Sequence, residues 1–251
     1  MKNLFYLSLL FTIISCGRDS TVEIINEPNT PNTKLVKKLL ITQTQGGQSN
    51  NVTYMFKYNV NGKVEKVLID NDELEYQIIY NSKNKPTEFI YFGESNKYNF
   101  QYDSNNKLVS IISGHINSSE TKKFDVTFSD NDNTIRVSTS DNYGNISTQI
   151  YNFENLNLTS LKNGYSNIGT VFTYDKNENP FYYMFDREIF LTNNLDFRGF
   201  GDKEYMSKNI INKSESAHNI YNYTNIYDTT HHLIKSSYGD NYEFYQMAIT
   251  Y

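Results

Sequence analysis

The strongest hairpin signal in the chain lies in Phe56-Lys57-Tyr58-Asn59-Val60-Asn61-Gly62-Lys63-Val64. Its two aromatic residues are separated by one lysine, which is the period of two expected of a β-strand with one buried face. Asn61-Gly62 is the dipeptide most typical of a tight hairpin turn, because both residues accept a left-handed backbone. Val64 then returns the chain to an apolar pattern. The stretch therefore predicts a β-hairpin.

The same pattern recurs along the chain. Tyr58, Tyr80 and Tyr102 lie 22 residues apart, and each is followed by Asn or Asp, a short polar turn, a lysine and an apolar residue. Looser copies are found at Phe128–Ile135, Tyr151–Asn155 and Phe172–Pro180. Self-similarity at a fixed period is the signature of a repeat architecture. Each unit has room for two strands and two turns, which predicts an antiparallel meander of roughly 14 to 16 strands.

A meander of this size has consequences for its shape. Open sheets with so many strands usually curl, split or close. We therefore predict an all-β fold in which the hairpin repeats form a curved single sheet or an open half-barrel. Residues 34–251 would make up this β-repeat domain.

One segment, Arg187–Asn209, interrupts the alternation. It contains two glycines and the charged run Asp202-Lys203-Glu204, and a loop of this length in a compact domain is usually functional or disordered. We predict a short helix here that crosses the concave face of the sheet. Strand patterns resume at His218–Tyr227, His232–Tyr238 and Tyr242–Tyr251.

The amino-terminal segment has the layout of a secretory signal peptide. A short basic start precedes the apolar run Leu4–Ile14, which is too short to span a bilayer, and Ser15 then precedes the only cysteine, Cys16. The end of this segment resembles the lipobox of bacterial lipoproteins. That resemblance implies that residues 1–15 are removed and that Cys16 is lipidated. The polar residues 16–33, with two prolines, would form a flexible tether.

Composition limits the classes of function. A net charge of −5 with mixed signs does not favour a nucleic-acid partner. With Cys16 lipidated, no thiol remains for a disulfide, a metal site or a nucleophile. We expect a protein anchored to the outer membrane through Cys16, either periplasmic or surface-exposed, and no cofactor.

The aromatic-Asx hairpins resemble the YD repeats of bacterial surface and toxin-shell proteins. Taken together with the lipobox, the tether, the step at Asn179-Pro180-Phe181 and the Ser207–Ile210 segment, they are similar to a family of YD-like lipoproteins of Bacteroidetes. That family is of unknown function and is described as having a porin-like half-barrel fold. The resemblance implies a fold and a location, and it brings no catalytic residues.

The residues that could bind metal are better explained as structural. Asp130–Asn133 and Asp70–Glu73 alternate carboxylates as a calcium loop does, but they fall at repeat turns and lack the rest of the EF-hand pattern. His231 and His232 are adjacent, so on a strand they would point to opposite faces. With only His115 and His218 besides, zinc is the less favoured interpretation.

Two further patterns concern hydrolase chemistry and O-glycosylation. No G-x-S-x-G motif is present, and a pair of carboxylates for glycoside cleavage does not show in sequence spacing. Asp19-Ser20-Thr21 and Asp228-Thr229-Thr230 resemble the O-glycosylation acceptor motif of Bacteroidetes, which makes Ser20 and Thr229 candidate modification sites.

The sequence favours a lipid-anchored, non-enzymatic binding or scaffold module that meets a glycan or a protein partner at its concave face. A hydrolase or lyase acting on polysaccharide, and a structural subunit of an envelope complex, are the alternatives. A membrane-spanning barrel is disfavoured, because Lys63, Glu65 and Lys66 put charge on both faces of one strand.

Overall fold

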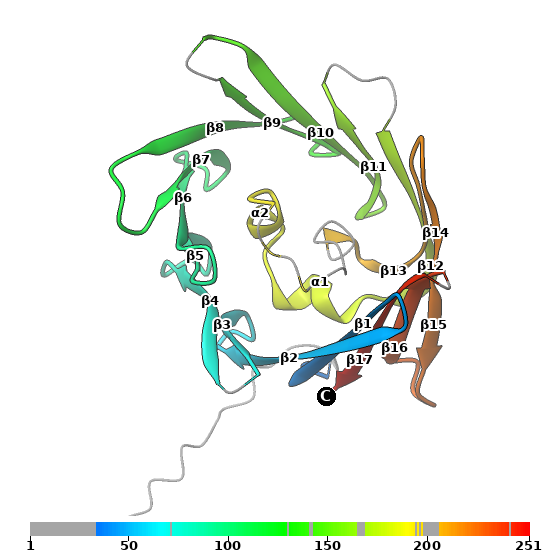
Figure 1. The fold of residues 1–251 in the computed structure, drawn as a ribbon. Helices are drawn as coiled ribbons and strands as arrows, with labels where there is room; N and C mark the ends of the chain where they lie inside the picture. Colours follow the sequence, from blue (N-terminus) through cyan, green and yellow to red (C-terminus); the bar gives the residue numbers. More distant parts are fainter. Residues whose placement is uncertain are drawn as a thin grey trace, which may run out of the picture.

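The computed structural model describes residues 34–70, 72–129, 131–140, 143–164, 169–193, 195, 197, 206–240 and 242–251. Over these residues the chain forms a 17-stranded sheet that rolls around two short helices (Figure 1). The predicted signal peptide, the lipidation site Cys16, the tether and the candidate glycosylation site Ser20 lie outside the described residues.

The elements follow in chain order. The strands are β1 (Lys38–Gln45), β2 (Gln48–Tyr58), β3 (Val64–Ile69), β4 (Glu73–Tyr80), β5 (Pro86–Tyr91), β6 (Asn96–Tyr102), β7 (Leu108–His115), β8 (Thr121–Phe128), β9 (Thr134–Ser140), β10 (Ile146–Glu154), β11 (Asn157–Asn163), β12 (Gly169–Glu178), β13 (Asn209–Glu215), β14 (Ile220–Asn222), β15 (Thr224–Tyr227), β16 (Leu233–Gly239) and β17 (Glu243–Thr250). The helices are α1 (Pro180–Met184) and α2 (Arg187–Phe190), both between β12 and β13.

The sheet nearly closes into a barrel. Each strand from β1 to β13 pairs antiparallel with the next, as do β15 with β16 and β16 with β17. Strand β1 also pairs with β17, from Lys38↔Thr250 to Gln45↔Glu243. In the described part of the chain the one unsealed seam lies between β14 and β15, which are separated by Tyr223. The predicted antiparallel meander is confirmed, and it curves further than an open half-barrel.

The predicted turns owe their shape to the Asx residue of each unit. The Asn59 side-chain oxygen accepts hydrogen bonds from the backbone N–H groups of Asn61 and Lys63, at 3.0 Å each. Asn81 and Asp103 cap their own turns in the same way. Gly62 has a positive φ of 74°, and Asn84 and Asn106, the residues 22 and 44 positions later, have φ values of 57° and 59°. Asparagine tolerates this left-handed backbone, so these turns form without glycine.

The tyrosine before each Asx residue reaches back to the preceding unit. The hydroxyl of Tyr80 donates to the carbonyl oxygen of Val64 at 2.8 Å, and that of Tyr102 donates to Pro86 at 2.8 Å. Further along the chain the hydroxyl of Tyr174 donates to the carbonyl oxygen of Leu158 at 2.6 Å. In all three pairs the tyrosine follows its acceptor residue by sixteen positions.

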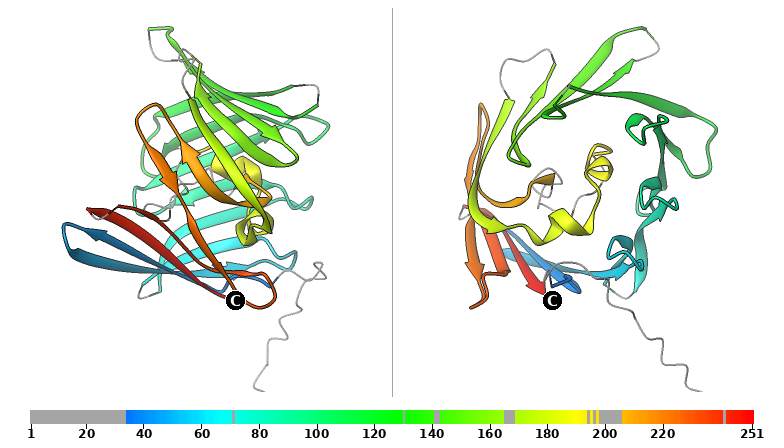
Figure 2. Two further views of the ribbon diagram at one scale, coloured as in Figure 1. Left: turned by 90° about the vertical axis from the view of Figure 1, so that its right-hand side faces the viewer. Right: turned by 180° about the vertical axis from the view of Figure 1, so that it is seen from behind.

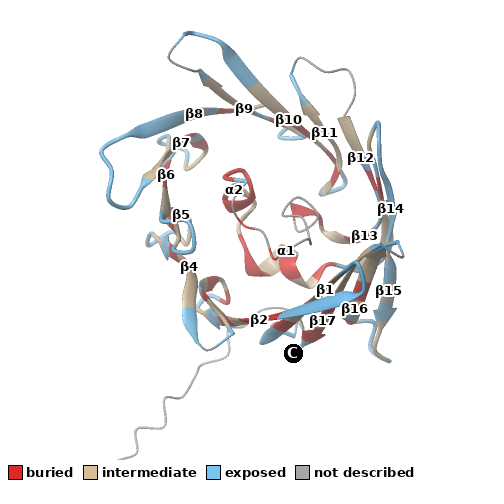
Figure 3. Ribbon diagram, viewed as in Figure 1, coloured by how far each residue is buried: buried red, intermediate tan, exposed pale blue. Residues whose placement is uncertain are grey.

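The core lies inside the barrel, between the inward side chains of the strands and a plug formed by the described residues of 180–197 (Figure 3). Phe197 is at its centre, with its ring 5.0 Å from that of Tyr54, 5.8 Å from that of Phe56 and 6.2 Å from that of Tyr76. The exposed outer side chains include Lys57, which lies opposite Lys66 across β2 and β3.

The described residues contain no helix that is both long and apolar enough to cross a bilayer.

The segment that breaks the repeat contributes most of the plug. The helix predicted within Arg187–Asn209 is α2, but it lies inside the barrel rather than across an open concave face (Figure 1). A second helix, α1, was not predicted. It begins after Asn179, whose side-chain oxygen accepts a hydrogen bond from the N–H of Phe181 at 3.0 Å, and Pro180 occupies its first turn. The step at 179–181 therefore starts a helix.

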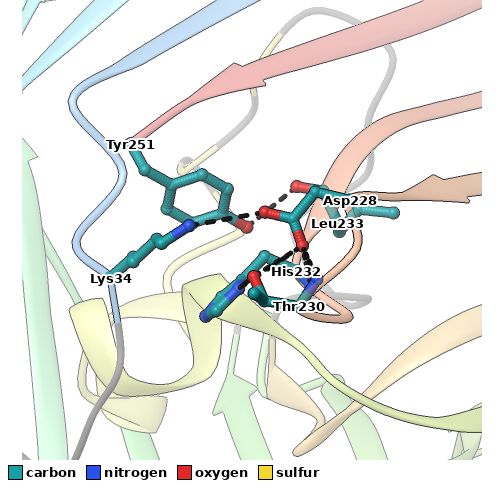
Figure 4. A network of polar contacts seen from close by, with 6 residues as sticks. All are labelled: Lys34, Asp228, Thr230, His232, Leu233 and Tyr251. Atoms are coloured by element: carbon teal, nitrogen blue, oxygen red, sulfur yellow. Dashed lines mark hydrogen bonds and ion pairs between the residues drawn. The ribbon is translucent and has the colours of Figure 1, made fainter.

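The barrel has two different ends (Figure 2). The Asx turns, which connect β2 to β3, β4 to β5, β6 to β7, β8 to β9 and β15 to β16, all lie at one end, called here the Asx end. Neighbouring Asx turns are joined by side chains, as in the bond from the Lys83 ammonium to the Asn106 side-chain oxygen at 2.9 Å. The first described residue, Lys34, and the last residue, Tyr251, lie at this end as well, beside Asp228 (Figure 4).

Candidate ligand-binding site

A pocket of about 240 Å³ opens at the Asx end between the plug and the hairpin turns. We call it the mouth pocket. Its charged and aromatic lining residues are Lys63, Lys85, Asp186, Arg187, Glu188, Tyr182 and Tyr183. Leu156, Phe185, Phe190 and Met206 form its apolar walls.

The repeat supplies two of the charged groups, Lys63 and Lys85, and the plug supplies the other three. Lys63 and Lys85 are equivalent residues of successive units, so the meander places them on adjacent turns. Asp186 is the N-cap residue of α2, and Glu188 lies in its first turn. The Lys63 ammonium is 3.7 Å from a carboxylate oxygen of Asp186, and the Lys85 ammonium is 3.1 Å from one of Glu188. These ion pairs join the plug to the barrel wall.

Asp186 is incompletely satisfied. Its side chain is 15% exposed, and its Oδ2 atom is buried without a hydrogen-bond partner. Burial raises the pKa of Asp186 above its ordinary value, and the neighbouring Glu188 adds to the rise, while Lys63 and Lys85 partly offset it. A buried acceptor without a donor costs free energy. The ionised form of Asp186 is therefore disfavoured where this residue lines the mouth pocket.

Aromatic rings surround these charges. The Arg187 guanidinium lies 5.0 Å from the ring centre of Phe153, which fixes it at the pocket wall. The rings of Tyr182 and Tyr183 are 5.1 Å apart and nearly perpendicular. The hydroxyl of Tyr183 contacts Glu178 at 3.4 Å. Burial raises the pKa of Tyr80 and of Tyr102, with smaller contributions from Asp186 and Glu188, so both hydroxyls remain neutral donors.

The residues singled out from the sequence lie elsewhere. Thr229 is exposed on the turn between β15 and β16, so its glycosylation stays a prediction. Asp132 pairs with Lys107 at 2.6 Å, and Asp70 accepts a hydrogen bond from the N–H of Thr53 at 2.9 Å, so both take part in turns. Asn71 and Asp130 lie outside the described residues.

The histidines are not brought together as one group. His115 ends β7 and His218 lies between β13 and β14, both at the end opposite the Asx turns. His232 was expected to begin a strand, but both His231 and His232 occupy the turn before β16, where His231 has a φ of 64°. The two therefore line one pocket rather than opposite sheet faces. Over the described residues, no group of three or more His, Cys, Asp or Glu residues is placed to hold a metal.

Sequence reasoning missed Asp186, Glu188 and the two lysines that meet them. The lysines carried a signal, since both close an Asx turn at the same repeat position. The carboxylates carried none, because the plug has no periodicity that would show which way its side chains point.

Similarity to known proteins is found in the fold and not in the sequence. No family model matches the sequence, and no curated protein matches it. A porin-like protein from Bacteroides uniformis is 12% identical with a TM-score of 0.54, over 89% of this chain and 99% of that one. A porin-like protein from Bacteroides vulgatus is 13% identical with a TM-score of 0.53, over 86% and 98% of the two chains.

The chain shares the fold of these porin-like proteins. The porin-like shape implied by the sequence resemblance is thereby confirmed, while the YD-repeat lipoprotein assignment stays a prediction. In this porin-like barrel the interior is occupied by the plug, and the mouth pocket lies at the boundary between the plug and the barrel wall.

Proposed function

We propose that this protein is a non-enzymatic saccharide-binding module of the bacterial cell envelope, anchored to the outer membrane through a lipid on Cys16. The ligand occupies the mouth pocket. The filled interior supports a binding role over a role as a pore, since Phe181, Phe185 and Phe197 are all buried inside the barrel. The anchor rests on the signal-like segment and on the residue before Cys16.

The observation that carries the proposal is the convergence of two lysines, two carboxylates and the paired rings of Tyr182 and Tyr183 in the mouth pocket. The hydroxyls of a sugar would accept hydrogen bonds from the ammonium groups of Lys63 and Lys85 and donate to the carboxylate of Glu188. A sugar ring also has apolar C–H faces, which suit the rings of Tyr182 and Tyr183. The pocket thus combines apolar walls with a few polar groups that would fix the orientation of the ligand.

A glycoside hydrolase is the second candidate, and one observation favours it. The two carboxylates of the mouth pocket have different surroundings: burial raises the pKa of Asp186, whereas Glu188 is paired with Lys85 at 3.1 Å. Glycosidases commonly use such a pair, with the protonated carboxyl as the acid and the ionised one as base or nucleophile. In this mechanism Asp186 would protonate the leaving oxygen.

The test is calorimetric titration of the protein with a panel of neutral and acidic oligosaccharides, repeated for Tyr183→Ala and Asp186→Ala. We expect each substitution to weaken binding about tenfold or more, the loss of one stacking or hydrogen-bonding contact. Tyr242→Ala is the matched control, because Tyr242 is 69% exposed and lies at the other end of the barrel. If no sugar in the panel binds, the proposal is wrong.

The same panel separates binding from hydrolysis. Each oligosaccharide is incubated with the protein, and new reducing ends are measured. A binding module releases none. Release that is lost in Asp186→Asn, while affinity for the oligosaccharide is retained, would establish the hydrolase instead.

A further inference from the structure

A second pocket, of about 450 Å³, opens at the Asx end on the other side of α1. We call it the side pocket. Its lining includes the charged and aromatic residues Lys34, Lys176, Glu178, His231, His232 and Tyr251. They come from the start of the described chain, the end of β12, the β15–β16 turn and the carboxyl terminus.

Helix α1 is the partition between the two pockets. Asn179 and Pro180 line the side pocket, while Tyr182 and Tyr183 line the mouth pocket. A helix rises about 1.5 Å per residue, so Pro180 and Tyr182 are only about 3 Å apart along its axis. The hydroxyl of Tyr183 also contacts Glu178 at 3.4 Å, which links the linings of the two pockets directly. One extended ligand could therefore contact both.

The acidic side chains Glu178 and Asp228 near the side pocket each have a lysine partner. Glu178 lies 3.8 Å from the ammonium of Lys208. Asp228 accepts hydrogen bonds from the backbone N–H groups of His232 and Thr230 and from the Thr230 hydroxyl, and lies 3.4 Å from Lys34 (Figure 4). These hydrogen bonds hold the pKa of Asp228 below its ordinary value. The Asp228 carboxylate is therefore occupied by hydrogen bonds within the turn and by its ion pair with Lys34.

The basic groups are less committed. Among the described residues, no carboxylate forms an ion pair with Lys176 or with His231. His232 uses its Nδ1 atom for the Thr230 hydroxyl at 2.7 Å, which leaves Nε2 for another partner. Lys176 is therefore an exposed cation of this pocket that forms no ion pair with a described side chain, in a chain with a net charge of −5.

We infer that the mouth pocket and the side pocket are two subsites of one site for an acidic oligosaccharide, whose uronate carboxylate lies in the side pocket against Lys176 and His231. This inference rests on the proposed function, because the mouth pocket holds the neighbouring sugar. The carboxylate would be the anionic partner that the Lys176 ammonium lacks among the described side chains, and α1 would lie beneath the glycosidic link.

The test is titration of the full-length protein with oligogalacturonate and with the same oligomer as its methyl ester, which keeps the sugar and removes the charge. We expect the acid to bind about tenfold more tightly than the ester, the worth of one charge-assisted hydrogen bond. Lys176→Gln should remove this preference and leave the affinity for the ester unchanged. Tyr183→Ala should weaken the binding of both. Lys57→Gln, on the exposed outer wall, is the matched control.

The outcomes distinguish this inference from the proposed function. Equal affinity for acid and ester, with no effect of Lys176→Gln, overturns the acidic-ligand inference and leaves saccharide binding standing. Sensitivity to Lys176→Gln without sensitivity to Tyr183→Ala makes the pockets independent and overturns the shared site. If other sugars bind the mouth pocket and oligogalacturonate does not, the inference alone fails. Absence of binding to any sugar removes both.

Discussion

The hydroxyl of Tyr80 donates a 2.8 Å hydrogen bond to the carbonyl oxygen of Val64, the first residue after the preceding Asx turn. Tyr102 makes the equivalent bond to Pro86. Each hairpin unit is thereby tied to the one before it by a side chain as well as by the strand ladder. The tyrosine ring remains in the core while its hydroxyl satisfies a backbone carbonyl at the Asx end.

The first prediction concerns this bond. Tyr80→Phe removes the hydroxyl and keeps the ring, so we expect the free energy of unfolding to fall by about 1–2 kcal/mol, because the Val64 carbonyl loses its donor. Urea denaturation of the two proteins measures the difference. Tyr242→Phe, at an exposed position, should change stability by less than about 0.5 kcal/mol. Equal effects of the two substitutions would contradict a structural role for the Tyr80 hydroxyl.

The second prediction concerns alkaline pH. Burial raises the pKa of Tyr58, Tyr80 and Tyr102 above the ordinary value. The neutral hydroxyl is therefore favoured by folding: its contribution is complete below the unfolded pKa of about 10 and is lost as the pH rises toward the folded value. We expect the protein to lose stability progressively above about pH 10. Ultraviolet titration should show these tyrosines ionising together with unfolding, and ionisation near pH 10 in the folded protein would count against it.

The third prediction concerns the plug. Phe197 contacts rings from both β2 and β4, as well as Phe181 and Phe185 within the plug. Phe197→Ala should cost about 3–5 kcal/mol, since it removes a large side chain from a packed interior. Thermal denaturation measures the loss. Phe197→Leu should retain most of the stability, and a tolerated alanine would show that the plug is not part of the cooperative core.

The fourth prediction concerns Asp186, whose raised pKa means that its ionised form is disfavoured in the folded state. Its contribution to stability is present at low pH and is lost as the pH rises through the folded pKa. Asp186→Asn does not titrate, so its stability relative to the wild type should increase with pH across this range. Denaturant unfolding at several pH values tests this. A difference in stability between the two proteins that stays constant with pH would show that burial does not raise the pKa of Asp186.

The fifth prediction concerns the amino terminus. If Cys16 is the lipidated residue, the protein expressed in a bacterial host should incorporate labelled fatty acid and fractionate with the outer membrane. Cys16→Ser should remove the label and release the protein from the membrane fraction. Serine-substituted protein that still carries the label would place the lipid elsewhere.

The periodic part of the fold could be predicted from the sequence because strand alternation and turn chemistry are both local. The interval of 22 residues and the Asx residues after Tyr58, Tyr80 and Tyr102 sufficed for the meander and its turns. The near closure could not be predicted, since the pairing of β1 with β17 joins residues about two hundred positions apart. No local pattern records such a contact.

The candidate site could not be predicted from the sequence, for a related reason. Lys63 and Lys85 could be placed on one end by the repeat, but Asp186 and Glu188 depend on how the plug packs. That packing is set by the aromatic residues of the plug against the barrel wall, a tertiary effect. The histidine pair was misplaced because the strand after it begins at Leu233, and the turn therefore includes His232.

The ring contacts of Phe197 reach the barrel wall from inside, and this has a consequence for the size of the molecule. A chain of self-similar hairpins has no intrinsic reason to stop at a given length, because every added unit would find the same tyrosine and Asx partners. A wider ring would leave the plug without contact on one side. The non-repeating segment therefore limits the circumference of the barrel. Duplication of one 22-residue unit should produce a barrel too wide for the plug to contact its wall on every side.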